Sequence, residues 1–443
     1  MVMQYARAGE IVDHESMLRK ARLSSFIGTV IEWYDFFIYG AAAALVFGSL
    51  FFPQSTPLIG TMAAFGAFAV GFIARPLGGV IFGHFGDRIG RRAVLIVTLT
   101  IMGLSTFLIG LLPTYSQIGI LAPILLTLLR VAQGLALGGE WGGAVLMVVE
   151  HSPPDRRGWN SAWPQLGVPA GLVLSTGVMA MMNFLTADEF HDWGWRVPFL
   201  ISIALVAVGM LIRMAIDETP IFSDLEEKGE IKKFPVLEVF RSNKKMVLLT
   251  IGARFAENGS FFIFTVFSLT YATKYIHVSE NAILGAVVIA ALCTIVTIPI
   301  FAGLTDQIGR RPVFLAGVIF TGLFAFPFFW MIQTGQPALI TLAIVLALSV
   351  GWGAMYAPQA AYFAEFFPPQ VRYSGMSIGA QLVAIVAGGP SPLIATAAVA
   401  YAQGSPWLIA LWLIGCSVIS TVALLCSPET KGRDLNSRDV NDY

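Results

Sequence analysis

Charged side chains within long apolar stretches are the residues of this sequence that are most able to do chemistry. Glu32 and Asp35 lie three residues apart in one such stretch, and Arg130 lies in another. In a membrane each ionisable side chain costs about 2.5 kcal/mol or more, so each suggests a function. Adjacent carboxylates do not both ionise cheaply in a low dielectric, so one should bind a proton. If Arg130 faces them, protonation and ion pairing exclude each other, and protonation frees the guanidinium for a carboxylate substrate. We therefore predict proton coupling by Asp35, Glu32 and Arg130.

A second set of polar side chains in apolar stretches is suited to binding a solute. The sequence RFAEN (254–258) places three of them on one helical face, and Trp352, Tyr356 and Gln359 share another. The alternatives are an internal salt bridge for the first group and ordinary aromatic packing for the second. With three further amides, the predicted substrate contacts are Arg130, Gln133, Gln165, Arg254, Glu257, Asn258, Trp352, Tyr356, Gln359 and Gln381.

Two more ionisable residues in apolar stretches leave alternatives open. Glu140 is flanked by four glycines (GGEWGG, 138–143), which favours close helix packing. It is either a second proton site or a structural residue. Arg75 precedes Pro76, and we expect its side chain to extend toward the membrane surface or to support an inner gate.

Long helices must hold these residues. Of 443 residues, 56% are hydrophobic and 12% are charged, whereas soluble domains carry roughly 25% charged residues. Lipid is therefore the expected solvent, and the unbroken apolar runs indicate helices rather than the alternating strands of a barrel. We predict an all-α integral membrane protein with twelve spans at 24–50, 59–82, 93–112, 118–149, 160–184, 197–216, 246–272, 281–304, 312–332, 337–364, 375–401 and 406–426.

The positions of lysine and arginine predict the orientation. With the N-terminus inside, only Lys274 and Arg196 fall in external segments. Both termini are therefore expected in the cytoplasm. The protein is expected to cross the inner or plasma membrane of the cell several times. The predicted organisation is a tail (1–23), a six-helix bundle (24–216), a charged cytoplasmic loop (217–245), a second six-helix bundle (246–426) and a short tail (427–443).

Two motifs repeat six spans apart. GHFGDRIGRR (83–92) matches AGLTDQIGRR (302–311), and EHSPPDRR (150–157) matches EFFPPQVR (365–372), which implies two parallel halves. Each aspartate can meet a helix N-terminus across the halves, and the arginines can pair with the glutamates. We predict a cytoplasmic gate of Asp87, Arg88, Arg92, Glu150, Arg157, Asp306, Arg311, Glu365 and Arg372. The alternative, arginines that only anchor the topology, stays open for Arg91 and Arg310.

These motifs carry a family resemblance. The sequence resembles the major facilitator superfamily in both loop motifs. It also resembles that superfamily's metabolite:proton symporter family in three further stretches, RVAQGLALGGEWGGA (130–144), WGWRVPF (193–199) and WYDFFIYG (33–40). This family includes permeases for shikimate, 2-oxoglutarate, citrate and proline/betaine. PETKG (428–432) is similar to the sugar-porter branch. The resemblance implies that the first, fourth, seventh and tenth spans surround the cavity. It also implies that Asp35 pairs with Arg130, as the matching residues do in sugar porters.

The expected function is proton-coupled uptake of a small organic solute by alternating access. A carboxylate such as a shikimate-like or dicarboxylic acid is favoured, because the short C-terminal tail has no heptad run like that of osmosensing betaine carriers. The alternatives are a proline/betaine-type osmolyte or a sugar and, in other classes, a non-transporting sensor or a membrane enzyme. The five histidines have no metal-ligand spacing, so we expect no metal, no cofactor beyond the proton gradient, and no enzymatic activity. No nucleic-acid partner is expected, and the chain should act as a monomer.

Overall fold

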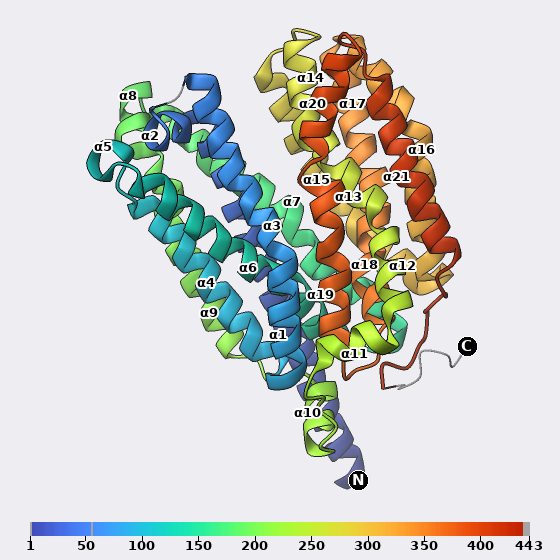
Figure 1. The fold of residues 1–443 in the computed structure, drawn as a ribbon. Coiled ribbons are helices and arrows are strands. Elements are labelled where there is room, and N and C mark those ends of the chain that lie inside the picture. Colours follow the sequence, from blue (N-terminus) through green and yellow to red (C-terminus); the bar gives the residue numbers. More distant parts are fainter. Residues whose placement is uncertain (1, 55, 437–443) are drawn as a thin grey trace.

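The computed structural model describes residues 2–54 and 56–436, and every regular element in those ranges is helical. Figure 1 shows two bundles side by side, close together at the lower end and apart at the upper end. The first bundle contains α1 (Val2–Ala42), α3 (Pro57–Ile89), α4 (Arg91–Leu111), α6 (Leu121–Val149), α7 (Arg157–Met181) and α9 (Arg196–Met214), and the short α2 (Gly48–Phe51), α5 (Tyr115–Ile118) and α8 (Ala187–Glu189) lie at its upper end.

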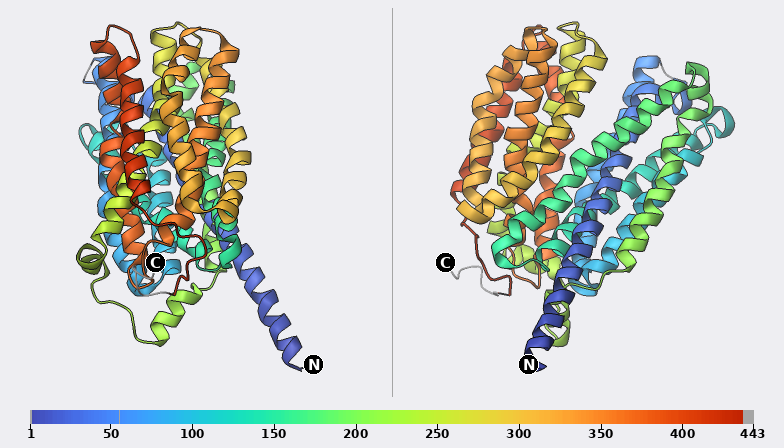
Figure 2. Two further views of the ribbon diagram at one scale, coloured as in Figure 1. Left: turned by 90° about the vertical axis from the view of Figure 1, so that its right-hand side faces the viewer. Right: turned by 180° about the vertical axis from the view of Figure 1, so that it is seen from behind.

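The second bundle, yellow-green to red in Figure 1, begins after a connecting segment that carries α10 (Pro220–Glu227) and α11 (Pro235–Ser242). It contains α12 (Lys244–Ala253), α13 (Phe255–Phe262), α14 (Ser268–Lys274), α15 (Glu280–Ile308), α16 (Arg310–Gln333), α17 (Pro337–Val345), α18 (Gly353–Ala364), α19 (Arg372–Val383), α20 (Ser391–Tyr401) and α21 (Trp407–Leu425). The start of α1 and the connecting segment lie at the same end of the molecule (Figure 2).

The spans differ from the prediction in their continuity. Within the described residues, ten helices are long and apolar enough to cross a membrane, and an eleventh is obtained when α1 and the bent segment after it count as one. The eleventh expected span, 375–401, consists of α19, the π-helical turn η7 (Ala384–Gly388) and α20, each shorter than a full crossing. Gly389 and Pro390 interrupt it, because glycine disfavours a helix and proline lacks the N–H that the helix needs.

The repeated loop motif has the same backbone in both halves. Gly90 alone joins α3 to α4, and Gly309 alone joins α15 to α16, with φ angles of 100° and 106°. A side chain is strained at such angles, so glycine is required at the point where each chain reverses. The two loop motifs therefore have the same local structure, as the sequence repeat predicts.

The two bundles meet along a few helices. In the first bundle α3 packs against α6, and α1 packs against α7. Between the bundles, α3 lies beside α19 and α7 lies beside α15. These interbundle contacts bring the repeated motifs together at the end where α10 and α11 lie.

π-Helical turns interrupt the helices at several points of the spans. They include η1 (Ala43–Phe47) after α1, η5 (Ile263–Phe267) after α13 and η6 (Leu346–Trp352) before α18. Such turns occur frequently at functional sites because they widen the helix and re-aim its side chains. Trp352, a predicted substrate contact, is the last residue of η6.

Candidate functional site

A chain of three hydrogen bonds connects Asp35 to Arg130 inside the first bundle. Arg130 Nη1 donates to Gln133 Oε1 at 2.7 Å, and Gln133 Nε2 donates to Thr106 Oγ1 at 2.6 Å. Thr106 Oγ1 donates to Asp35 Oδ2 at 2.6 Å. Every donor points from the cation toward the acid, which is the arrangement that stabilises an ionised carboxylate.

The structure inserts two polar side chains where we expected a direct pair. Among the described residues, no ion pair joins Asp35 to Arg130, and the guanidinium instead lies 4.0 Å from the ring centroid of Tyr39 and 4.9 Å from that of Phe68. Gln133, predicted to contact substrate, lies inside the chain of hydrogen bonds. The sequence analysis missed Thr106, because threonine is common in membrane helices and no spacing pattern singles it out.

Glu32 has different neighbours from the other acid of α1. Gly28, Glu32 and Phe36 follow one another at intervals of four residues on one helical face. Gly28 packs against the ion pair of Glu140 and Arg213. The guanidinium carbon of Arg75 lies 5.5 Å from the Phe36 ring centroid. Glu32 is buried, and its Oε2 has no hydrogen-bond partner among the described residues. The two predicted proton acceptors therefore occupy separate environments.

Glu140 forms an ion pair with Arg213 of α9, and both side chains are at most 2% exposed. A second guanidinium nitrogen of Arg213 lies 3.2 Å from Glu140 Oε2, and Thr98 Oγ1 donates to the same oxygen at 2.6 Å. This satisfied pair agrees with the structural alternative for Glu140. The sequence analysis missed Arg213, although an arginine inside the expected span 197–216 was itself a signal.

Replacing Arg213 by methionine should destabilise the folded protein, because Glu140 would remain as an unpaired buried charge. Removing one partner of a buried pair costs roughly 3–5 kcal/mol. The double variant Arg213→Met/Glu140→Gln should recover most of the loss, since it leaves no net charge. Thermal unfolding in detergent measures both effects, and a single variant as stable as the wild-type protein would contradict the structural role. Proton-driven uptake by the double variant would exclude Glu140 as a proton site.

Glu257 accepts hydrogen bonds from three residues of the second bundle. Arg254 Nη2 lies 3.2 Å from Oε2, Asn258 Nδ2 donates to the same oxygen at 2.6 Å, and Trp352 Nε1 donates to Oε1 at 3.0 Å. The internal salt bridge that we considered as an alternative is therefore present. It also faces the other bundle, because the guanidinium of Arg254 lies 5.1 Å from the ring centroid of Trp141 in α6.

Trp141, Gln165 and Tyr356 connect the bundles beside this cluster. Trp141 Nε1 donates to Gln165 Oε1 at 2.9 Å, and Gln165 Nε2 donates to the backbone oxygen of Tyr356 at 2.7 Å. The Tyr356 ring stacks on Trp352 with 4.3 Å between centroids. The predicted aromatic face of the tenth span thus lies at the contact between the two halves.

The last two predicted amides lie on the interior helices α18 and α19. Gln359 is fully buried, and neither polar atom of its amide has a hydrogen-bond partner in the described part of the chain. Gln381 is largely buried and lies beside Gly79 of α3, in the opposite bundle. Their role as substrate contacts stays a prediction.

The two predicted gate aspartates reach across the bundles to helix N-termini. Asp87 accepts hydrogen bonds from two backbone N–H groups in the first turn of α19, at 3.1 and 2.9 Å. Asp306 accepts two from the first turn of α7, both at 2.8 Å. The first N–H groups of a helix have no partner within it, and the helix dipole favours an anion there. Both halves thus use the same device.

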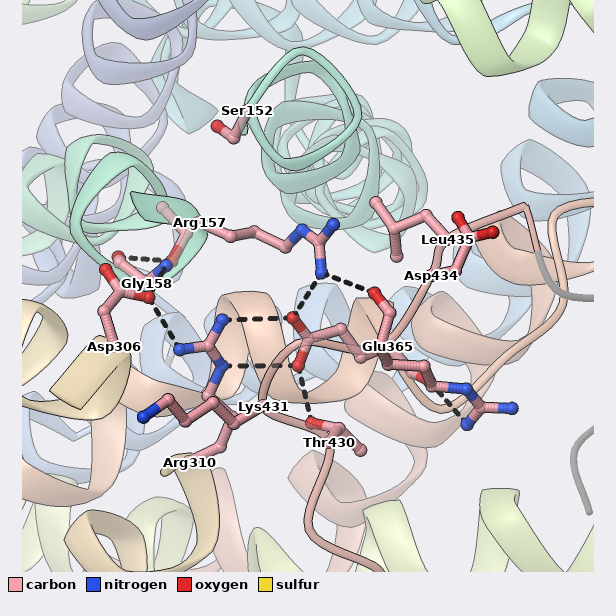
Figure 3. A network of polar contacts seen from close by, with 12 residues as sticks. Ser152, Arg157, Gly158, Asp306, Arg310, Glu365, Thr430, Lys431, Asp434 and Leu435 are labelled. Carbon is pink, nitrogen blue, oxygen red and sulfur yellow. Dashed lines mark hydrogen bonds and ion pairs between the residues drawn. The ribbon is translucent and has the colours of Figure 1, made fainter. Parts of the chain in front are cut away.

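Glu365 is the centre of a buried ion network that crosses between the bundles. Arg157 of the first bundle donates to Oε1 at 2.8 Å, and Arg310 Nη2 donates to the same atom at 3.1 Å. Figure 3 shows both guanidinium groups converging on this carboxylate, with Thr430 donating from the other side. All three charged side chains are at most 3% exposed.

Glu150 has the matching place in the other half of the repeat. Arg91 lies at 3.3 Å and Arg372, from the second bundle, at 3.1 Å. Burial alone would raise the pKa of the Glu150 carboxyl, but the two guanidinium groups outweigh it and hold that pKa below its ordinary value. Glu150 therefore stays ionised and keeps both arginines.

Three arginines that we predicted in the gate lie outside these networks. Arg88 is exposed, Arg92 donates to the backbone oxygen of Met214 at 2.8 Å, and Arg311 donates to that of Leu425 at 3.2 Å. Arg91 and Arg310, for which two interpretations were open, are the buried members instead. In each GRR sequence the first arginine starts a helix and turns inward, and the second points outward.

The sequence analysis also missed two glutamates that cap helices of the gate. Glu218 accepts hydrogen bonds from the backbone N–H groups of Arg91 and Arg92, both at 3.0 Å, at the start of α4. Glu429 accepts those of Arg310 and Arg311, at 2.9 and 3.0 Å, at the start of α16. The similar sequences ETP (218–220) and ETK (429–431) are the signal that comparison of the halves would have detected.

Tyr373 of the second bundle packs against glycines of the first bundle at the gate. Its side chain lies against Gly86, Gly142 and Gly143 of the first bundle, and a Cβ added at Gly86 or Gly143 would collide with it. Its hydroxyl donates to the backbone oxygen of Gly139 at 2.8 Å. The glycines around Glu140 therefore provide a socket for a side chain from the opposite bundle.

The comparisons with known proteins agree with this architecture. The model of the Major Facilitator Superfamily matches residues 25–392 and 262–439. The chain is 41% identical to the shikimate transporter of Escherichia coli, over 93% of this chain and 94% of that protein. It is 34% identical to the proline/betaine transporter of Escherichia coli, over 96% and 86% of the two chains.

Solved structures of the proton:xylose symporter XylE share the fold. The form bound to 6-bromo-6-deoxy-D-glucose has a TM-score of 0.76 at 16% identity, covering 96% of this chain and 98% of that one. An inward-open conformation of XylE from E. coli gives 0.63 at 15% identity, covering 94% and 98%.

Proposed function

The chain belongs to the major facilitator superfamily and is a multi-pass membrane transporter, and we propose that it carries a small organic carboxylate into the cell together with a proton. In this proposal the bundles 24–216 and 246–426 of a single chain move as units about the central polar residues. The gate end faces the cytoplasm of a cell that holds the protein in its inner or plasma membrane, and we propose that both termini are cytoplasmic.

The observation that carries the proposal is the chain of hydrogen bonds from Arg130 to Asp35. An ionised Asp35 makes the final bond charge-assisted. When Asp35 takes a proton it no longer needs a donor, and the Thr106 hydroxyl can turn to its other acceptor, the backbone oxygen of Met102 at 3.0 Å. The chain of hydrogen bonds then loses the negative charge that aligned its donors. Protonation of Asp35 therefore also changes the hydrogen bonding of Gln133 and Arg130.

The contacts of the gate support alternating access. Asp87, Asp306, Arg157 and Arg372 each contact the opposite bundle. An inward-facing form has to break all of these contacts, since each spans the interface that must open. We propose that binding of the solute and the proton at the centre supplies the free energy that shifts this equilibrium.

The carboxylate class rests on two facts. The relatives that match at 41% and 34% identity transport shikimate and proline or betaine, which all carry a carboxylate. The buried centre of this chain also holds arginines from three spans, Arg75, Arg130 and Arg254.

Uptake into proteoliposomes tests the proposal. An inward proton gradient should drive shikimate above its external concentration, and a protonophore should abolish the accumulation. Uptake that is insensitive to the gradient would contradict the coupling. A thermal-shift screen against organic acids, betaines and sugars tests the solute class, since a ligand of the folded state raises the melting temperature.

Replacing Thr106 by valine should slow proton-driven uptake while preserving the packing of α4. The change removes the donor to Asp35 at nearly constant volume. A hydrogen bond to a charged group is worth roughly 1.5–3 kcal/mol, which corresponds to a roughly 10- to 100-fold effect. Thr100→Val is the matched control, because the Thr100 hydroxyl donates only to the backbone of its own helix, at 2.7 Å from Ile96 O. Equal uptake by both variants would refute the role of this chain of hydrogen bonds in proton coupling.

A further inference from the structure

Arg75 is a buried arginine that is not in direct contact with an acidic side chain among the described residues. Its guanidinium carbon lies 4.4 Å from the ring centroid of Phe72 and 5.5 Å from that of Phe36. Among the described residues its side chain forms neither an ion pair nor a hydrogen bond. A buried cation without such partners is costly, so its retention indicates that an anion binds there during the working cycle.

Arg75 lies where the two bundles meet. Phe36 and Phe72 pack against Phe262 of the second bundle, with ring centroids 6.4 and 5.6 Å apart. The positive charge of Arg75 is attracted by Glu32 and repelled by Arg254 of the opposite bundle, so both groups lie within electrostatic range of it. A ligand on its guanidinium would therefore touch both halves, which is the position that alternating access requires of a transported solute.

The other two central arginines are already engaged. Arg130 donates to Gln133 and is 2% exposed, whereas Arg75 is 8% exposed. Arg254 is paired with Glu257. Of these three guanidinium groups, that of Arg75 forms no ion pair or hydrogen bond within the described residues and is therefore uncommitted.

The charge balance of the centre agrees with this assignment. Leaving aside the paired Glu140 and Arg213, three acids and three bases surround the centre, and their charges cancel when all are ionised: Glu32, Asp35, Glu257, Arg75, Arg130 and Arg254. A proton on Asp35 leaves one positive charge uncompensated. A single carboxylate restores neutrality in a low dielectric, where an uncompensated charge is most costly.

We propose that Arg75 binds the carboxylate of the transported solute, while Arg130 acts in proton coupling. The inference rests on the proposed function and assigns its substrate class as a monocarboxylate. The planar guanidinium fits a carboxylate through two parallel hydrogen bonds. The body of the solute lies against the aromatic rings of Phe36, Phe72 and Phe262.

Binding of an acid and of its neutral ester separates this role from a structural one. The affinities of purified protein for shikimate and for methyl shikimate are measured by thermal shift, for the wild-type protein, Arg75→Gln and Arg75→Lys. Arg75→Gln should weaken shikimate binding by roughly 10- to 100-fold and leave the ester within about threefold. Arg75→Lys keeps the charge but loses the planar fork, so an intermediate loss for the acid alone is expected. If the glutamine variant does not fold, the lysine variant provides the same comparison.

The outcomes distinguish the two proposals. If the Arg75 variants bind shikimate as tightly as the wild-type protein does, the role of Arg75 is overturned and the proposed function is left intact. An equal loss for acid and ester would also overturn it, because Arg75 would then only shape the site. Wild-type protein that binds neither shikimate nor any other acid of the screen would refute the proposed function, and this inference with it.

Discussion

Asp35→Asn should abolish proton-driven accumulation of the solute while leaving exchange across the membrane measurable. Asparagine has nearly the same shape and accepts a hydrogen bond from Thr106, so the site should stay assembled. It cannot take up or release a proton, so solute movement is no longer tied to the proton gradient. The expected loss of uphill uptake is complete, which makes this the largest single effect that we predict.

Two measurements in proteoliposomes check this result. Uphill uptake is driven by an imposed pH difference, and counterflow is measured with solute on both sides and no gradient. The matched control is Asp155→Asn, because Asp155 is an exposed acid paired only with exposed Arg156. Glu32→Gln is the decisive comparison within α1. If Glu32→Gln removed uphill uptake and Asp35→Asn kept it, the proton would be carried by Glu32.

Glu365→Gln should open the cytoplasmic gate. The substitution leaves the guanidinium groups of Arg157 and Arg310 in a buried space without the charge that holds them. Removing one partner from a buried ion network costs roughly 3–5 kcal/mol, and this cost falls on the closed state, because opening returns the arginines to water. The closed-to-open ratio should therefore fall by roughly two to four powers of ten. Transport should fall with it, since the carrier rarely returns to the outward-facing form.

A cysteine reporter measures the opening directly. Ser377→Cys places a thiol on α19 against Gly142 of the first bundle, where the closed gate buries it. In a background without Cys293, Cys416 and Cys426, this thiol should react much faster with a water-soluble maleimide when Glu365→Gln is added.

The control for this experiment is a charge removed from a surface pair. Asp224→Asn breaks the exposed bond to Lys228, whose two side chains are about half exposed, and such pairs contribute at most about 1 kcal/mol. It should leave both labelling and transport unchanged. Labelling of the Glu365→Gln reporter at the unmodified rate would refute the gate.

The sequence by itself determined the all-helical membrane fold and the repeated loop motifs. An apolar run long enough to cross a membrane has to be a helix there, because every backbone polar group must find a partner within it. The matching GRR and PP motifs placed equivalent residues in both halves, and Gly90 and Gly309 have the same backbone conformation. Asp87, Glu150, Asp306 and Glu365 were identified in this way, because their neighbours within the motifs specify what each of them meets.

Only the tertiary structure decided which partner each buried polar group has. Spacing along one helix predicts a face but not the neighbour across it, so the threonine between Asp35 and Arg130 and the partner of Glu140 had to come from packing. The same holds for Arg91 and Arg92, which are adjacent in sequence, because the turn at Gly90 directs one inward and the other outward. Arg75, expected to extend toward the membrane surface or to support an inner gate, lies against the rings of Phe36 and Phe72, and Phe72 packs on Phe262 of the second bundle. In a membrane the cost of each buried charge depends on its nearest partners, and those come from spans far apart in the chain.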